Sequence, residues 1–474
     1  RSGHVRGVGQ RPTTSTFPQP GHVHQDPVEI WETTLASILE AIGRSGDRHQ
    51  DIEAIGIVNQ RETTVVWDRT TGKPLAPAIV WQSRESDAWV DAIRQRGREG
   101  DYQRMTGLVP DAYFSATKLA MLFDNDPELR QRALAGEVLF GTIDTWLLWN
   151  LTGGRVHATD VTNASRTMLF DIRERSWSQS LLDDLGIHAS ILPDVRASSG
   201  SFGVIDADIL PLDAPILGMA GDQHAALFGQ ACFARGDVKC TFGTGAFMLM
   251  NTGGEPIDSS HGLLTTVAWQ IPSGVRYALE GSVFIAGAAV QWLRDGLGII
   301  ETSGEVEALA RSVPDSDGVV FVPALVGLGA PHWDSSARGS IFGITRGTTS
   351  AHIARATLDA IAFQVTDVLT AMRQDSGLTL AEIRIDGGAA GNDLLAQTLA
   401  DLLGLPVVRP EQLETTALGA VFLAGLAAGV WRNEGELAEI WKAEARFEPS
   451  IGEEERASRL ERWHDAVDRS RRWV

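Results

Sequence analysis

Cysteine is almost absent from this chain of 474 residues, which contains only Cys232 and Cys240. Two thiols cannot build a disulfide framework, and the sequence places no other metal ligands beside them. A disulfide-stapled secreted domain and a cysteine-rich metal site are therefore both excluded. We expect both side chains to be buried small hydrophobes in a protein of the reducing cytosol.

Lysine is nearly as rare. The chain contains only Lys73, Lys118, Lys239 and Lys442, and none of them stands in a Gly-Lys-Ser/Thr motif. A Walker-type phosphate loop is therefore excluded, and the motif set of protein kinases is missing as well. Residues 387–391 read GGAAG, which is not the G-x-G-x-x-G of dinucleotide-binding folds, so a dehydrogenase is only weakly supported.

Positive charge is in deficit, with 41 Lys and Arg against 61 Asp and Glu and a net charge of −20. Such a chain repels phosphate backbones, which excludes nucleic acid as a partner. It also repels free ATP. Any nucleotide site must therefore supply its own hydrogen-bond donors and a metal ion.

Long apolar runs are missing too. The uncharged residues 415–431 fall short of the roughly 20 residues that span a bilayer, and they are rich in Ala and Gly. We expect a buried, closely packed helix there, no membrane insertion, and a soluble cytoplasmic protein. No signal peptide opens the sequence, and a start at Arg1 instead of Met indicates a fragment or a misplaced gene start.

The length predicts two or three domains, and the alternation of strand and helix patterns predicts an α/β fold. A boundary near residues 229–236 divides the chain into expected domains of residues 1–229 and 230–474. Asp26, Pro27 and Glu29 predict a helix start with a capping box. Strands are expected at residues 52–58, 63–67, 216–220 and 383–386, a hairpin at 239–250, and helices at 87–96, 118–123, 143–151 and 453–473.

Three glycine turns have the composition of anion sites, because glycine lets the backbone N–H groups approach a ligand closely. They are residues 242–245 (FGTG), 386–392 (DGGAAGN) and 221–223 (GDQ). Each alone is more often a plain tight turn, but together they favour a phosphate site. Backbone donors and Mg²⁺ would replace the missing lysine, which is the logic of actin-like ATPase folds.

Several segments carry a resemblance to one family. They are residues 59–64 (NQRETT), 79–82 (IVWQ), 113–118 (YFSATK), 160–167 (DVTNASRT), 220–223 (AGDQ), 241–245 (TFGTG), 327–334 (GLGAPHWD) and 339–344 (GSIFGI). In this order and spacing, from about Gly21 to the C-terminus, the chain resembles the glycerol kinase branch of the FGGY carbohydrate kinases. The resemblance implies two actin-like (ribonuclease H-like) domains with a cleft between them.

The resemblance also implies the residues that bind a triol. Arg61 and Glu62 would offer a donor fork and an acceptor to adjacent hydroxyls, and Gln223 would orient the substrate. Trp81, Tyr113 and Phe247 would cover its C–H face. Without the family, ordinary core packing is the better interpretation of Trp81 and Phe247, and a surface ion pair that of Arg61 with Glu62.

By the same resemblance, Asp222 is the general base for ATP-dependent phosphorylation of glycerol to glycerol 3-phosphate, and it helps to hold Mg²⁺. Alone, an Asp after a strand is more often a helix cap. The predicted ATP site comprises Gly243, Thr244, Gly287, Gln291, Gly388 and Asn392. We expect a homodimer or homotetramer. A kinase of another polyol or a ketose, and a non-catalytic glycerol-binding descendant, are the alternatives.

The sequence departs from the family at its start. Relatives open with an element that reads roughly Asp-Gln-Gly-Thr-Thr-Ser, and residues 2–6 resemble the turn and strand after it. The chain as given is therefore expected to have little or no activity, reduced on the order of 10³-fold or more, and one sheet is expected to expose an edge. Residues 206–215 are acidic and lack Arg, so no control by fructose 1,6-bisphosphate is expected. His22 and His24 could form a metal pair, but a solvated loop is the favoured interpretation.

Overall fold

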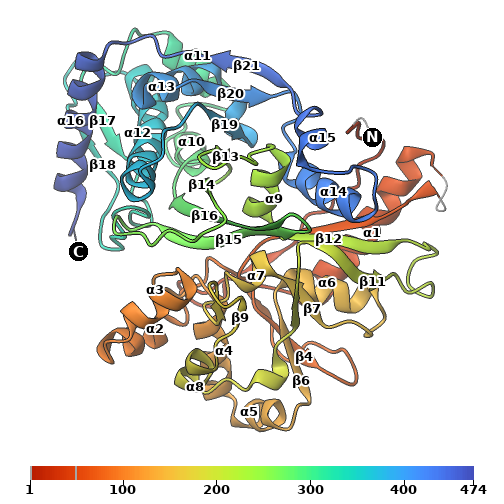
Figure 1. Ribbon diagram of the computed structural model, residues 1–474. Coiled ribbons are helices and arrows are strands. Elements are labelled where there is room, and N and C mark those ends of the chain that lie inside the picture. The colour runs from red at the N-terminus through yellow and green to blue at the C-terminus, as the bar shows by residue number, and fades with distance from the viewer. Residues whose placement is uncertain (1–2, 48–50, 474) are drawn as a thin grey trace.

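A computed structural model describes residues 3–47 and 51–473 of the chain. In Figure 1 most of the first half of the chain, in orange to yellow, forms the lower part of the molecule, whereas the red N-terminal segment lies at the right and begins at the upper right. The second half, in green to blue, forms the upper part around a central sheet.

The strands of the first half are β1 (Ser15–Thr16), β2 (His24–Gln25), β3 (Ile55–Asn59), β4 (Val65–Asp68), β5 (Ala78–Ile79), β6 (Val138–Gly141), β7 (Ala158–Asp160), β8 (Phe170–Asp171), β9 (Ser176–Trp177), β10 (Asp194–Arg196), β11 (Ser199–Val204) and β12 (Pro215–Gly221). The helices are α1 (Pro27–Ser45), α2 (Asp87–Gln95), α3 (Glu99–Thr106), α4 (Ser115–Asn125), α5 (Pro127–Leu134), α6 (Ile143–Leu151), α7 (Val161–Ala164), α8 (Gln179–Leu185) and the 3₁₀ turn η2 (Ala189–Ile191).

The strands of the second half are β13 (Val238–Phe242), β14 (Ala246–Gly253), β15 (Leu264–Ile271), β16 (Gly274–Val283), β17 (Val320–Val322), β18 (Ser340–Phe342), β19 (Ile383–Asp386), β20 (Val407–Pro410) and β21 (Ala443–Phe447). The helices are α9 (Asp222–Gly229), α10 (Gly287–Asp295), α11 (Glu305–Arg311), α12 (Ser350–Ser376), η3 (Gly388–Gly391), α13 (Asp393–Leu403), α14 (Thr415–Ala427), α15 (Glu434–Ala438) and α16 (Glu453–Ser470).

The central sheet of the second half has the strand order β15-β16-β14-β13-β19-β20-β21 in the described part of the chain. Alternate side chains of a strand face opposite sides of a sheet. On β14, Met248 and Met250 pack with the cluster that includes α12 and α13, whereas Leu249 packs with α9 and α14. The sheet is therefore covered on both faces, which is the layered arrangement expected for an α/β fold.

A second sheet, in the order β11-β12-β3, lies where the two halves of the chain meet. Helix α14, from the second half, packs on β3 and β12 and on α9. Glycines allow this close approach, since a Cβ on Gly419 would lie 1.8 Å from the carbonyl oxygen of Ala225. The closely packed helix predicted for residues 415–431 is thus confirmed over residues 415–427, and no helix of the described residues is long and apolar enough to cross a membrane. Helix α14 belongs to the second half of the chain but packs on strands of the first half. The domain boundary at 229/230 stays a prediction.

The chain before α1 departs from its prediction. Residues 3–6 form no strand, and Ser2 lies outside the described residues. A strand needs a neighbour to complete its ladder, and here Gly3 lies near Ile440 and Leu418, whereas Gly7 and Gly9 lie against α1. A Cβ on Gly7 would lie 2.2 Å from the Ala41 carbonyl oxygen, and one on Gly9 2.0 Å from that of Ser37. In the second sheet β3 is the terminal strand among the described residues.

Most of the expected elements are confirmed. Helix α1 begins after Asp26, whose carboxylate accepts from the Val28 N–H at 2.8 Å. The prediction of a capping box is wrong, because the Glu29 carboxylate accepts from the backbone N–H and hydroxyl of Thr14 instead of the backbone N–H of Asp26. Both cysteines are free and buried as predicted, and burial raises the pKa of each thiol.

Candidate active site

A buried ion network connects the two halves of the chain. Arg61, between β3 and β4, donates to both oxygens of Glu280 on β16, at 2.6 Å and 2.9 Å. Arg166, just after α7, donates through Nε to Glu62 at 2.7 Å and lies 3.1 Å from Glu280. All four side chains are at most 2% exposed. Two positive and two negative charges therefore compensate one another away from water, as burial of ions requires.

Burial and these partners move the pKa values in opposite directions. Burial opposes ionisation of Glu280, but Arg166 and Arg61 outweigh it and hold the pKa of Glu280 well below its usual range. Burial raises the pKa of Glu62, although Arg61 and Arg166 act against the rise. Burial lowers the pKa of Lys118 to about 7, although Glu62 acts against the fall, and its Nζ donates to the carbonyl oxygens of Glu62 and Tyr113.

Asp222 lies at the edge of this network, at the first position of α9. Its Oδ1 is 3.1 Å from the Nε of Arg61 and accepts from the Gln223 N–H at 2.7 Å. Its side chain is 35% exposed, in contrast to the four network residues. Asp222 is therefore the most exposed carboxylate of the group. The close packing of Arg61 on Gly221, where a Cβ would lie 2.6 Å from the Arg61 Cγ, fixes this arrangement.

Gln223 is held by a buried lysine on the neighbouring strand. Lys239 of β13 donates to the Gln223 side-chain oxygen, to the Thr241 hydroxyl at 2.9 Å and to the Phe247 carbonyl oxygen at 3.3 Å. Burial lowers the pKa of Lys239. The amide of Gln223 is thus oriented by a residue outside the predicted site.

Three aromatic rings form one wall. The Trp81 ring lies edge-on to Tyr113 at 5.5 Å and to Phe247 at 6.1 Å between centroids. Edge-to-face contact is a favoured geometry for aromatic pairs. Trp81 and Phe247 remain partly exposed, and Tyr113 is buried. The structure therefore brings Phe247 of β14 together with Trp81 and Tyr113 from the first half of the chain.

Two of the three predicted glycine turns, residues 242–245 and 386–392, meet at one end of the central sheet, whereas residues 221–223 lie at the end of β12 of the second sheet. The tip of the β13–β14 hairpin closes with the Gly243 N–H donating to the Gly245 carbonyl at 2.8 Å. The start of α10 is bound to this tip, since the Gly287 N–H donates to the Gly243 carbonyl at 3.1 Å and the Ala288 N–H to that of Thr244 at 3.0 Å. A Cβ on Gly287 would lie 2.5 Å from the Gly243 oxygen, which explains glycine there.

The turn after β19 lies beside the same hairpin. Strands β13 and β19 are parallel, with Thr241 opposite Asp386, and a Cβ on Gly387 would lie 2.3 Å from the Phe242 carbonyl oxygen. A cavity of 160 Å³ is lined by Thr241, Asp386, Gly387, Gly388, Leu413, Glu414 and Thr416. Gly388 is exposed, and Asn392 caps α13 by accepting from the Leu395 N–H at 2.9 Å. Gln291 is exposed on α10.

Comparison with known proteins finds relatives over the whole length of the chain. The N-terminal domain model of the FGGY family of carbohydrate kinases matches residues 1–229, and the C-terminal domain model matches residues 238–428. Glycerol kinase of Burkholderia ambifaria is 54% identical over 474 residues, covering 100% of this chain and 95% of the relative. Glycerol kinase of Deinococcus radiodurans is 55% identical over 471 residues, covering 99% and 94%.

The chain belongs to the FGGY family of carbohydrate kinases. It is thus a phosphotransferase with an alcohol group as acceptor. The solved structure of Plasmodium falciparum glycerol kinase with ADP matches with a TM-score of 0.90 at 36% identity, covering 97% of this chain and 92% of that one. A gluconate kinase from Lactobacillus acidophilus matches with a TM-score of 0.85 at 23% identity, which shows the fold alone. The predicted actin-like fold of two domains is confirmed.

Several residues of this FGGY site escaped sequence reasoning. Glu280 and Lys239 were not predicted, and Arg166 was only quoted within a matching segment. The one signal in the sequence for Glu280 is its position between Leu279 and Gly281 in an apolar strand. A carboxylate buried in such a strand needs a buried partner of opposite charge. Its partner Arg61 lies 219 positions away, so only the fold joins them.

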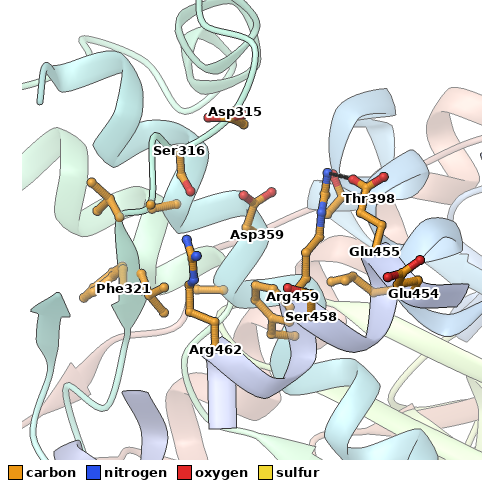
Figure 2. Close-up of a pocket in the computed structure, with 17 residues that line it drawn as sticks. Asp315, Ser316, Phe321, Asp359, Thr398, Glu454, Glu455, Ser458, Arg459 and Arg462 are labelled. Atoms are coloured by element: carbon orange, nitrogen blue, oxygen red, sulfur yellow. Dashed lines mark hydrogen bonds and ion pairs between the residues drawn. The ribbon is translucent and has the colours of Figure 1, made fainter. Parts of the chain in front are cut away.

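A cavity of 530 Å³ lies elsewhere in the FGGY fold, between β17, α12, α13 and α16 (Figure 2). It contains no predicted site residue. Two of its charged pairs are closed within the chain, since Arg459 pairs with Glu455 and Asp359 with Arg355. Because none of the predicted site residues lines it, we treat the cavity as separate from the candidate site.

Proposed function

We propose that the chain transfers the γ-phosphoryl group of ATP to a terminal hydroxyl of glycerol and releases glycerol 3-phosphate and ADP. The observation that carries the proposal is the accessible Asp222 carboxylate, fixed by Arg61 at 3.1 Å beside a wall of three aromatic rings. The 54–55% identity to proteins named glycerol kinase, against 23% to a named gluconate kinase, favours glycerol over longer sugars.

Asp222 acts as the general base in this proposal. Among the described residues, both of its polar contacts fall on Oδ1, so Oδ2 is open to accept the proton of the attacking hydroxyl. The contact with Arg61 holds the carboxylate in one orientation. Phosphoryl transfer depends mainly on position and on charge neutralisation, so a fixed carboxylate beside the nucleophile is the principal demand on this side.

Arg61 and Glu62 then bind the remaining hydroxyls. Arg61 donates two of its five N–H groups to Glu280, and its Nε lies 3.1 Å from Asp222, which leaves further donors for substrate oxygens. Glu62 uses Oε1 for Arg166, which leaves Oε2 as an acceptor. Gln223 orients the triol, and Trp81 with the other two rings covers its carbon chain.

ATP is bound by the glycine turns at the end of the central sheet. The N–H groups near Gly243 and Thr244 and the start of η3 at Gly388 supply donors to phosphate without lysine. Gly287 and Gln291 of α10 and Asn392 of α13 line the nucleotide on either side. The direct bonding of α10 to the hairpin tip supports one continuous site.

Mg²⁺ fits the donors present. The ion keeps several waters and binds through one or two carboxylates together with substrate phosphates. The side chain of Asp222 is partly exposed and offers a carboxylate oxygen, so it is the residue that would hold the ion, which supplies neutralisation of phosphate charge.

Two further proposals concern the enzyme as a whole. The two free, buried thiols support a reducing cytoplasm as its location. A homodimer or homotetramer is proposed for its assembly, and light scattering behind a sizing column measures the mass.

The test is a coupled assay of ADP release with glycerol and with a panel of other polyols and ketoses. It is run on this chain and on a version that also carries the Asp-Gln-Gly-Thr-Thr-Ser element ahead of Arg1. Glycerol-dependent ADP release that exceeds release with every other acceptor supports the proposal. A preference for a ketose or another polyol in the active version contradicts it. Comparable turnover by both versions refutes the expected loss of activity in the shorter one.

A further inference from the structure

Two histidines and a glutamate converge outside the active site. His22 Nδ1 lies 3.6 Å from one oxygen of Glu85, and His24 Nε2 lies 2.8 Å from the other. One ligand atom from each of the three side chains lies within 4.8 Å of the other two. All three residues are partly buried, so the histidine pair does not lie in the solvated loop that was predicted.

The backbone that carries these side chains is fixed independently of them. Strand β2 pairs with β5, with His24 opposite Ile79. The Val80 N–H donates to the Val23 carbonyl at 3.0 Å, and the Arg84 N–H to that of Gly21 at 2.8 Å. Because side chains two apart in an extended chain share a face, His22 and His24 both face the turn that bears Glu85. The geometry is therefore preformed.

The charge of Glu85 calls for a cation. Its side chain is 8% exposed, and among the described residues its ion-pair partners are the two histidines, neither of which is permanently charged. The nearby guanidinium of Arg84 pairs with Asp87 and Asp111 instead. A buried carboxylate is costly unless its charge is balanced, and although Lys118 acts on Glu85 from a distance, a divalent ion between the three side chains would supply a direct counter-charge.

We propose that His22, His24 and Glu85 bind a divalent transition metal, with Zn²⁺ the best match. Two imidazoles and one carboxylate suit Zn²⁺, whereas Mg²⁺ and Ca²⁺ take oxygen ligands. Bonds of about 2.0–2.2 Å place tetrahedral ligands roughly 3.3–3.5 Å apart, which small side-chain rotations here can reach. Three protein ligands leave a fourth position for water.

The ion would clamp the segment before α1 to the turn after β5. Trp81 of the aromatic wall lies in this turn, between Val80, which bonds to Val23, and Ser83, whose hydroxyl accepts from the Val23 N–H at 3.1 Å and donates to Glu85 at 2.8 Å. Metal binding therefore stabilises the loop that carries Trp81. The inference does not rest on the proposed reaction, because the three ligands lie outside the predicted substrate and nucleotide residues.

The experiment titrates the full chain with ZnCl₂ alone, by calorimetry and by competition with a chromophoric chelator, and follows the melting temperature. Wild type is expected to bind one equivalent and to melt at a higher temperature with Zn²⁺. His22→Ala should weaken this binding at least tenfold and remove the thermal shift. Its ring is the least buried of the three, at 26%, so the metal-free fold should persist, as the melting temperature without zinc will report. His24→Gln, which keeps a donor for Glu85, should lose the same equivalent.

His261→Asn is the matched control. His261 contacts the Asp375 carboxylate at 2.6 Å but has no second histidine beside it in the described residues, so the variant should bind Zn²⁺ like wild type. The proposal is overturned if wild type shows no saturable equivalent. It is also overturned if His22→Ala and His24→Gln both retain wild-type affinity, or if only the control loses it.

Discussion

Replacing Glu280 with glutamine removes the negative charge that two buried arginines share. Glu280 is fully buried and receives contacts from Arg61 at 2.6 Å and 2.9 Å and from Arg166 at 3.1 Å. The substitution leaves one uncompensated positive charge in the network and turns one acceptor oxygen into an N–H donor that faces a guanidinium. Breaking a buried ion pair from one side costs about 3–5 kcal/mol. We expect a loss of that size in the free energy of unfolding.

The kinetic consequence follows from Arg61, which also orients Asp222 through Nε at 3.1 Å. Without Glu280 the guanidinium is free to turn toward the remaining carboxylates, so both the substrate donors and the base lose their fixed positions. We expect the KM for glycerol to rise and kcat to fall in Glu280→Gln. Urea unfolding measures the change in the free energy of unfolding, with the dependence on urea concentration compared between variants. Coupled ADP release measures the changes in KM and kcat.

The matched control is Glu444→Gln. Glu444 also receives two donors from one arginine, Arg409, but its side chain is 50% exposed. Exposed pairs contribute about 0–1 kcal/mol, so this variant should stay within about 1 kcal/mol of wild type with unchanged kinetics. Equal stability losses in the two variants, or wild-type KM and kcat in Glu280→Gln, would refute the role given to the buried network.

Two further predictions concern the fold and its pH dependence. Lys118 has a folded pKa of about 7, below its value in the unfolded chain, so above pH 7 the unfolded state binds more protons. The free energy of unfolding should therefore rise between about pH 7 and 10, by at most about 1.4 kcal/mol per pH unit from this group. In Lys118→Met, urea titrations at each pH should show a smaller rise. An unchanged rise contradicts the assignment. Gly419→Ala places a Cβ 1.8 Å from the Ala225 carbonyl oxygen and should lower the melting temperature, whereas Gly43→Ala on α1, where a Cβ meets nothing within 4 Å, should be neutral or stabilising; equal melting temperatures would disprove the close packing of α14.

Local patterns predicted much of the fold. Helix α6 was expected at residues 143–151 and is found there, because an apolar run bounded by Gly153 and Gly154 leaves little choice. The β13–β14 hairpin follows from a glycine turn between two apolar strands. The helix α14 was predicted from composition alone, since Gly and Ala permit the approach of another backbone.

The long-range part of the site could not be predicted in this way. Glu62 and Arg61 were expected to face substrate as a simple pair, whereas the structure adds two buried partners from distant segments. Hydrophobic periodicity does not predict which strand places a charged side chain next to which loop. The same holds for Glu85, whose position beside His24 depends on the pairing of β2 with β5.

The most direct measurement on the central claim is glycerol-dependent ADP release by Asp222→Asn, made in the version of the chain with the higher turnover and accompanied by a glycerol-binding titration. If Asp222 is the general base, the turnover number should fall by about 10²–10⁴-fold while glycerol still binds, because Arg61, Glu62 and the aromatic wall remain. A variant that binds glycerol and turns over within a few fold of wild type would contradict the account.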